Sequence, residues 1–477
     1  MLSLPAEQRE ALWRRVFAIV ETYLQNVDSL PVAPNLDLKA IRAYIDAIDW
    51  QRPVTPEEAL AFADEGLTRF QVHTPHARYW GLFNPASTSM GIAADTLVAA
   101  FNPQIAAWSH NPFAAEVERV IVQRFGELFG YREDAIDGVL ASGGMEANHT
   151  ALLTALTDKH PEFLTYGLRS LPCQPVFYVS AECHHSFPKA ARMCGLGSSA
   201  VRHVPVDSDL RMRVDALEQM IEADKASDQA PFAVMATAGT TNAGAIDPLP
   251  EIAQVARRYE LWFHVDAAWG GGAAFVPELR HLLDGIELSD SITFDAHKWL
   301  SVPMGAGVYL TSDPEILDRT FSVPTQYMPK DAEGLNVVDP HLHSMQWSRR
   351  FIGLKIFLSL AVAGMSGYEE AIRHQTRIGA LLRSKLAEAG WTLTNNTPLP
   401  VVCFTFPGAT AQDLQAIIRH VLSSGEAWIS TTVCAGERTV LRACVTNFRS
   451  SEKDVDALVA SLERARSAVK SLSGLTA

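Results

Sequence analysis

Two stretches decide the fold: LWFHVDAAWGGG at residues 261–272 and SITFDAHKWL at residues 291–300. Each begins with β-branched and aromatic residues, as a buried strand does, and then continues with small or polar residues. Amphipathic stretches such as 213–224 and 249–259 lie among strand-like runs of the same kind. This alternation predicts an α/β fold with a mostly parallel central sheet and helices on both faces. The remaining expected strands are 176–180, 200–206, 232–238 and 306–312.

The order of these patterns divides the chain into three parts. The first is rich in helical patterns, and one helix is expected to begin near Pro56, with Thr55 as its N-cap and Glu58 completing a capping box. The last has an α+β pattern, with strands expected at 401–407 and 439–447. We therefore expect an N-terminal helical segment at 1–80, a large domain at 81–370 and a small C-terminal α+β domain at 371–477.

Composition narrows the classes of partner. The 477 residues include 40 Lys and Arg and 54 Asp and Glu, which gives a formal net charge of −14. Because nucleic acids and anionic membranes are also negatively charged, neither is expected as a partner. The six cysteines form no C-x-x-C pair and indicate reduced thiols in the cytoplasm. Residues 8–25 mix charges with apolar residues at helical spacing, unlike a signal peptide, and the apolar run 356–365 is too short to span a bilayer.

Lys298 and Asp266 are the residues most suggestive of chemistry. Each follows or ends an expected strand, and ligands of α/β sheets bind at the carboxyl ends of strands. A lysine there can form a Schiff base with pyridoxal phosphate, and an acid there can pair with the protonated pyridine nitrogen. Alone, either one reads as a surface lysine or a turn residue. Together, one strand–helix unit apart, they favour a cofactor site.

Two further segments fit such a site. In LASGGMEANHTALLTAL (140–156), a turn of small residues opens a helix, so backbone N–H groups at Gly143, Gly144 and Met145 can hold a phosphate. In YVSAECHHSFPKAA (178–191), His184 lies just past a strand, where an imidazole can stack on an aromatic cofactor. A buried histidine is more often structural, and the neighbouring His185 leaves the choice between the two open.

Two other patterns resemble functional motifs, but the residues around them do not fit those motifs. GLGSSA at 195–200 satisfies G-x-G-x-x-A but precedes a strand instead of opening a helix, so a dinucleotide site is not expected. His341 and His343, with His184 and His185, suggest a metal site. No H-E-x-x-H or Cys–His ligand set accompanies them, so no metal is expected.

The four segments, in this order, resemble the fold-type-I pyridoxal phosphate enzymes and, within them, the group II amino-acid decarboxylases. The resemblance runs from about residue 73 to the C-terminus and implies pyridoxal 5'-phosphate as cofactor. It implies that Lys298 forms the Schiff base, Asp266 pairs with the pyridinium and His184 stacks on the ring. It also places Gly143, Gly144, Thr241, Ala268 and His297 around the cofactor. The chain departs from the family pattern in two places. The family's phosphate turn often carries Ser hydroxyls, whereas this chain has Gly143, Gly144 and Met145. Asp295 stands where several relatives have Asn, and its carboxylate would repel a phosphate.

The resemblance also addresses the reaction and the substrate. FSVPTQYMPKDAEGLN (321–336) resembles a mobile catalytic loop whose tyrosine, here Tyr327, returns a proton to the substrate Cα. The family's substrate pockets imply an aromatic or apolar side chain beside Phe83 and Trp108, although Ala106 stands where aromatic-specific relatives carry a large ring. Arg442 resembles an arginine facing the active site. The segment around Trp108 is expected from the partner subunit of a homodimer.

We therefore expect pyridoxal-phosphate-dependent decarboxylation of an L-amino acid to an amine and CO2. One alternative is another fold-type-I reaction, such as that of a lyase or a transaminase, which would give different products. Others are a protein that binds pyridoxal phosphate without turnover and, more remotely, a metal-dependent hydrolase.

Overall fold

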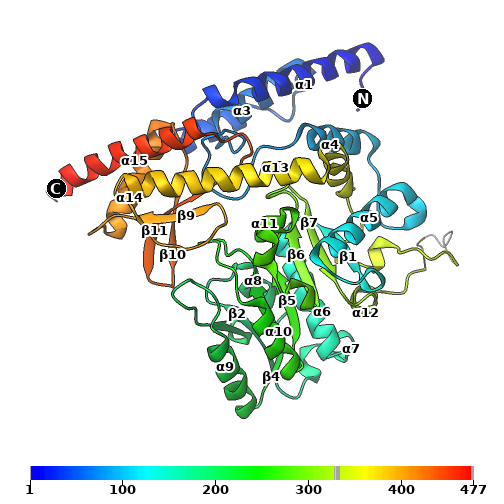
Figure 1. The fold of residues 1–477 in the computed structure, drawn as a ribbon. Coiled ribbons are helices and arrows are strands. Elements are labelled where there is room, and N and C mark those ends of the chain that lie inside the picture. The colour runs from blue at the N-terminus through cyan, green and yellow to red at the C-terminus, as the bar shows by residue number, and fades with distance from the viewer. Residues whose placement is uncertain (1, 327, 329–333, 474–477) are drawn as a thin grey trace.

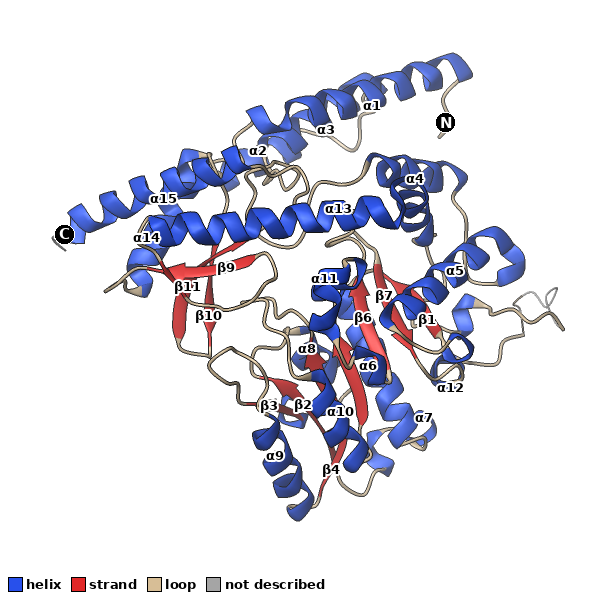
Figure 2. Ribbon diagram, viewed as in Figure 1, coloured by secondary structure: helices blue, strands red, loops and turns tan. Residues whose placement is uncertain are grey.

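A seven-stranded sheet forms the centre of the computed structural model, which describes residues 2–326, 328 and 334–473. Its strand order is β1-β7-β6-β5-β4-β2-β3 (Figures 1 and 2). All neighbours pair in parallel except those of β7, which is antiparallel to both β1 and β6. The prediction of a mostly parallel sheet is therefore confirmed. The strands are β1 (Asp137–Ala141), β2 (Gln174–Ser180), β3 (Val201–Val204), β4 (Gln229–Thr237), β5 (Trp262–Asp266), β6 (Ser291–Asp295) and β7 (Gly307–Thr311).

Helices cover both faces of this sheet, so its strands are buried on two sides. Along β5, Phe263 and Val265 enter one hydrophobic core, whereas Trp262 enters the other. This alternation follows from the two-residue period of a strand. Helices α6 (Gly144–Lys159) and α8 (Ser186–Met193) contribute to the core on the Trp262 side. Helices α5 (Pro112–Phe129), α9 (Val214–Ala226) and α10 (Leu249–Arg258) contribute to the opposite core.

The N-terminal part is helical, as expected. Helix α3 begins at Pro56 with the predicted capping box, in which Thr55 and Glu58 exchange hydrogen bonds. Helices α1 and α3 lie on the far side of α13 from the central sheet (Figure 1). The helices of this part and the short helices of the large domain are α1 (Ala6–Asn26), α2 (Leu38–Asp46), α3 (Pro56–Arg69), α4 (Ser89–Phe101), α7 (Phe163–Tyr166), α11 (Pro277–Arg280) and α12 (Ile316–Phe321).

Helix α13 (Gly353–Glu388) links the large sheet to a smaller, antiparallel one. It is kinked at Gly364, whose φ of 66° lies in the left-handed region that glycine tolerates. The expected domain boundary at 370/371 falls inside this helix, and the division into residue ranges stays a prediction. The smaller sheet has the order β10-β11-β9-β8 and packs with two helices. These elements are β8 (Thr392–Leu393), β9 (Val401–Thr405), β10 (Ser430–Cys434), β11 (Arg438–Cys444), α14 (Ala411–Ser424) and α15 (Glu452–Ser473).

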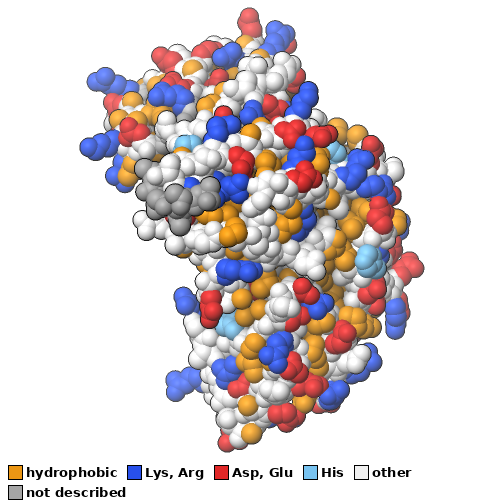
Figure 3. All heavy atoms as spheres, turned by 60° about the vertical axis from the view of Figure 1, so that its left-hand side comes forward, with side chains coloured by type: hydrophobic (Ala, Val, Ile, Leu, Met, Phe, Trp, Pro, Cys, Tyr) orange, Lys and Arg blue, Asp and Glu red, His pale blue; other side chains and the backbone are white. Residues whose placement is uncertain are grey.

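Two features of the structure concern nucleic acid and membranes as partners: the distribution of surface charge and the apolar length of the helices. On the face shown in Figure 3, Lys and Arg side chains are interspersed with Asp and Glu, so this face carries no extended basic patch. Within the described residues, no helix is long and apolar enough to cross a membrane.

Candidate active site

Seven of the nine expected cofactor residues, all but Gly143 and His297, line a cavity of about 210 Å³ at the carboxyl ends of β4, β5 and β6. The three strands end at Thr237, Asp266 and Asp295, and all three residues line the cavity. This is the position that parallel α/β sheets use for ligands. The other lining residues are Gly144, Met145, Asn148, His184, Gly239, Thr241, Ala268, Trp269 and Lys298.

Lys298 is held in this cavity by an ion pair. Its Nζ lies 3.0 Å from Oδ2 of Asp295, a buried carboxylate that also lies 3.8 Å from Nε2 of His297. The other oxygen of Asp295 is buried and has no hydrogen-bond partner among the described residues. Asp295, which departs from the family pattern, is thus the counter-charge of the lysine.

Asp266 is buried at the end of β5 and accepts two hydrogen bonds. Oδ1 accepts from the backbone N–H of Ala268 at 3.1 Å, and Oδ2 accepts from Nδ2 of Asn148 at 2.8 Å. A carboxylate has about four lone-pair directions, so Asp266 retains acceptor capacity toward the cavity that it lines. The side chain can accept a further N–H from a bound group.

His184 lines the same cavity, and its protonation is set by its surroundings. Burial lowers the pKa of the imidazole, an effect that nearby Asp266 opposes and Lys298 reinforces. The backbone N–H of Ser186 donates to Nδ1 at 3.1 Å. The neutral ring therefore carries its proton on Nε2. Ala268 and Thr241 line the cavity with it.

The expected phosphate turn opens helix α6 beside the lysine. The helix begins at Gly144, where its first-turn N–H groups lack partners within the helix. A Cβ on Gly144 would lie 2.8 Å from Oδ2 of Asp295, so the turn passes closely over that carboxylate. His297 accepts the N–H of Ala306 on Nδ1 at 3.1 Å, and burial lowers its pKa. The neutral ring thus keeps a donor on Nε2 near the turn.

These residues fit pyridoxal phosphate. The cavity joins an amine, a helix N-terminus for an anion and a buried carboxylate with free acceptor capacity. Thr237 adds a buried hydroxyl without a hydrogen-bond partner among the described residues. When bound, the cofactor supplies an electron sink for the bond that breaks.

A second cluster lies beside Lys298 and includes two of the expected substrate residues. Nζ of Lys298 is 6.0 Å from the ring centre of Phe83, and the guanidinium of Arg442 lies over the same ring at 4.8 Å. The ring of Phe83 also stacks on Trp269 at 4.4 Å. Arg442 is buried and donates to the carbonyl of Gly81, while its Nε and Nη2 have no hydrogen-bond partner among the described residues.

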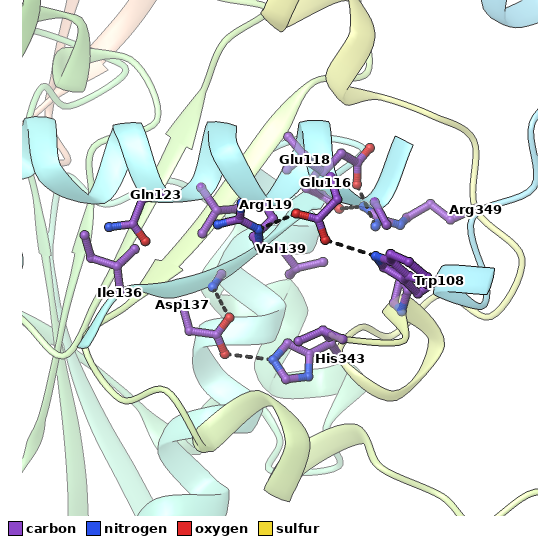
Figure 4. Close-up of a pocket in the computed structure, with 16 residues that line it drawn as sticks. Trp108, Glu116, Glu118, Arg119, Gln123, Ile136, Asp137, Val139, His343 and Arg349 are labelled. Carbon is purple, nitrogen blue, oxygen red and sulfur yellow. Dashed lines mark hydrogen bonds and ion pairs between the residues drawn. The ribbon is translucent and has the colours of Figure 1, made fainter. Parts of the chain in front are cut away.

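The other two expected substrate residues lie elsewhere in this chain. Trp108 lines a separate cavity of about 100 Å³, where its Nε1 donates to Glu116 at 3.0 Å (Figure 4). The carbonyl of Ala106 accepts from the backbone N–H of His341 at 2.9 Å and also lies 3.0 Å from Nδ1 of that histidine. The expectation that this segment serves the active site of a partner subunit stays a prediction.

Two of the four histidines weighed as metal ligands, His341 and His343, have partners outside the Lys298 cavity. His341 contacts Ala106, and Nε2 of His343 lies 2.8 Å from Oδ2 of Asp137 (Figure 4). The described residues contain no group of three or more His, Cys, Asp and Glu side chains placed to hold a metal ion. Tyr327, the expected proton donor, lies outside the described residues.

Sequence reasoning missed several residues of the site. Asn148 and Trp269 lie within quoted segments but match no motif position, and Phe83 was not linked to Arg442. His264 could have been found, because it lies two residues before Asp266 and so shares its face of β5.

Comparisons with known proteins agree with this geometry. The family described as "Pyridoxal-dependent decarboxylase conserved domain" matches residues 48–406. An aromatic-L-amino-acid decarboxylase from Bacillus atrophaeus is 28% identical over 466 residues, 95% of this chain and 94% of the relative. An L-aspartate decarboxylase from Metarhizium robertsii is 33% identical over 371 residues, 75% of this chain and 74% of the relative.

The fold comparison gives the same result. The crystal structure of mouse CSAD superimposes with a TM-score of 0.90 at 27% identity, covering 97% of this chain and 99% of the other. With the family match extending over most of the chain, the cavity of Lys298 and Asp266 falls inside the matched region. The chain therefore belongs to the pyridoxal-dependent decarboxylases and is a pyridoxal-phosphate-dependent amino-acid decarboxylase.

Proposed function

We propose that the enzyme decarboxylates an L-amino acid with an aromatic or apolar side chain, and that Arg442 binds the α-carboxylate. The observation that carries this proposal is the guanidinium of Arg442, which lies over the ring of Phe83 at 4.8 Å, while Nζ of Lys298 lies 6.0 Å from the same ring. Arg442 has two unused N–H-bearing nitrogens, enough for one carboxylate in a two-point contact. In the described part of the chain, the residues lining the Lys298 cavity add no other arginine or lysine for a second carboxylate.

We further propose a role for each residue around the cofactor. Lys298 would hold the cofactor covalently through its side-chain amine. Asp266 would keep a proton on the pyridine nitrogen, and this fixed positive charge would stabilise the electron pair that stays at Cα when CO2 departs. His184 and Ala268 contact the ring of the cofactor, and Thr241 lies beside that ring. The phosphate is held by Gly143, Gly144, Met145 and His297.

A panel of L-amino acids tests the substrate class. We expect CO2 and the corresponding amine from tryptophan, tyrosine or phenylalanine, and far slower release from aspartate, glutamate and cysteine sulfinate. Product analysis also separates decarboxylation from the lyase and transaminase alternatives, since a keto acid or a C–C cleavage product would contradict the proposal.

A second candidate class is an acidic substrate. It is favoured by the same free nitrogens of Arg442, which can bind a side-chain carboxylate instead of the α-carboxylate. Relatives that are aspartate and cysteine sulfinic acid decarboxylases support it as well. In this case the panel would show the acidic amino acids decarboxylated fastest.

Replacing Arg442 by leucine distinguishes the two bound groups. If Arg442 binds the α-carboxylate, we expect KM to rise about 10- to 100-fold for every substrate, the size of a lost hydrogen bond to a charged group. If it binds a side-chain carboxylate, only acidic substrates are affected. Arg438→Leu is the matched control, because Arg438 lies four residues away on β11 and is exposed. Steady-state kinetics across the panel give the answer.

We also propose that the enzyme is a homodimer. Helices α1, α3 and α4 line an open apolar hollow of about 410 Å³, which includes Val20, Leu60 and Ile92. On α1, Trp13 and Phe17 are 47% and 55% exposed, which is unusual for large apolar side chains next to such a hollow. A second copy that covers this surface would bury both side chains.

Sedimentation of a charged variant tests the dimer. We expect the wild type to sediment as a dimer and Phe17→Glu to raise the dissociation constant about 100-fold or more, because an unpaired charge would be buried. Gln8→Glu adds the same charge to an exposed position of α1 and is expected to stay dimeric. A monomeric wild type would refute the proposal.

A further inference from the structure

A row of buried polar side chains lies beneath helix α6, behind Asp266. Strand β5 directs Trp262, His264 and Asp266 to this side of the sheet, and Ser291 of β6 stands opposite His264 in the strand register. Asn148 reaches down from α6. All five side chains are at most 5% exposed. Buried polar groups are costly unless they are hydrogen-bonded, so each contact in this row is informative.

At the Trp262 end, the hydroxyl of Ser291 also hydrogen-bonds with the phenol of Tyr309, and the contacts allow a chain that runs in one direction. The indole Nε1 can only donate, and it donates to Oγ of Ser291 at 2.9 Å. Oγ of Ser291 lies 2.9 Å from Nδ1 of His264 and can donate its own proton there. Burial lowers the pKa of His264 to about 4, so the ring is neutral. With Nδ1 accepting, the ring proton lies on Nε2, 3.2 Å from Oδ1 of Asn148.

The Asp266 end requires the same arrangement independently. Nδ2 of Asn148 can only donate, and it donates to Oδ2 of Asp266 at 2.8 Å and to Oγ of Ser186 at 2.9 Å. The Oδ1 of Asn148 then faces His264 and must accept from Nε2. The Asp266 end thus fixes the amide orientation and the tautomer, and the contacts at the Trp262 end complete a continuous chain from Trp262 to Asp266.

We infer that His264 and Asn148 are positioning residues that keep Asp266 ionised and aimed at the pyridine nitrogen of the cofactor. This inference rests on the proposed pairing of Asp266 with that nitrogen. A buried carboxylate and a pyridine can share a proton as an ion pair or as a neutral pair. Hydrogen bonds donated to the carboxylate favour its charged form. The relay therefore maintains the protonated nitrogen and, with it, the electron sink.

Two variants interrupt the relay without changing its volume greatly. Asn148→Leu removes the donor to Asp266, and His264→Phe removes the group that fixes the amide. His264→Gln keeps a donor and an acceptor in the chain and serves as the conservative replacement. The matched control is Thr150→Val on the same helix, α6, which removes the 3.0 Å hydrogen bond from Oγ1 of Thr150 to the carbonyl of Glu146 and leaves the hydrogen bonds of the relay in place.

The readout is the ¹⁵N resonance of bound pyridoxal phosphate labelled at its pyridine nitrogen, measured beside kinetics on the holoenzyme. For Asn148→Leu and His264→Phe we expect the resonance to move to the unprotonated position and kcat to fall about 10- to 100-fold at little-changed KM. His264→Gln should stay within about threefold of the wild type in kcat. Thr150→Val should lose stability but leave the resonance in place.

Asp266→Asn separates this inference from the proposal beneath it. If Asp266→Asn leaves the nitrogen protonated, the proposed pairing fails. If Asp266→Asn deprotonates it while folded Asn148→Leu and His264→Phe stay protonated with kcat within about threefold, the pairing stands and the relay is overturned.

A measurement on the wild type covers variants that fail to fold. In ¹⁵N-histidine-labelled enzyme, the resonances of His264, identified by their loss in His264→Gln, should report the neutral tautomer with the proton on Nε2. A proton on Nδ1 would contradict the relay, because Asn148 would then face Asp266 with the wrong end of its amide.

Discussion

Replacing Lys298 by alanine is expected to lower amine formation by about 10³-fold or more, because the variant lacks the amine that forms the covalent link. In the native enzyme, Nζ of Lys298 lies 3.0 Å from Oδ2 of Asp295 in the candidate active-site cavity. No other lysine in the described part of the chain lines that cavity. Reduction of the native holoenzyme with borohydride should fix pyridoxal phosphate on the peptide that contains Lys298. Mass spectrometry of the reduced, digested protein makes this measurement.

Lys298→Ala also removes the counter-charge of Asp295, whose side chain is 2% exposed. Loss of stability could therefore imitate loss of chemistry. Lys298→Arg retains a positive charge for the ion pair but has no primary amine, so it should fold like the wild type and remain inactive. A label on another lysine, or an active Lys298→Arg variant, would contradict the assignment of Lys298.

The strands that could be predicted from the sequence are those whose local pattern agrees with their place in the sheet. Strand β5 is buried on both faces, and its run of apolar residues shows this directly. Strand β1 was missed because its sequence, DGVLA, starts with turn-forming residues and is short. Its place at the sheet edge depends on pairing with β7, a contact between residues about 170 positions apart that no local pattern encodes.

The site divides in the same way. Asp266 and Lys298 could be predicted because each is next to the end of a strand, and parallel strands bring such ends together. Asn148 could not, since its contact with Asp266 spans 118 positions and depends on how α6 lies on the sheet. Arg442 reaches Phe83 from the smaller sheet, so their contact depends on how that sheet packs against the loop before α4.

Replacing Tyr327 by phenylalanine is expected to reduce amine formation about 10²- to 10⁴-fold, the usual contribution of a positioned general acid. This prediction rests on the sequence of the loop 321–336. Loss of CO2 needs only the electron sink and a correctly oriented bond, and neither uses the phenol. The electron pair left at Cα would then wait for a proton and become open to attack by dioxygen.

Under air, the Tyr327→Phe variant should therefore convert part of the substrate, with one O2 and one water, into aldehyde, CO2, ammonia and hydrogen peroxide. The measurement is the ratio of amine to aldehyde, with peroxide and oxygen uptake followed in parallel. Tyr166→Phe makes the same change at a tyrosine that is 71% exposed on α7, and it should leave the ratio unchanged. If Tyr327→Phe formed amine at the wild-type rate, the proton would come from another group. Nε2 of His184, which lines the cavity of Lys298, is the next donor to test.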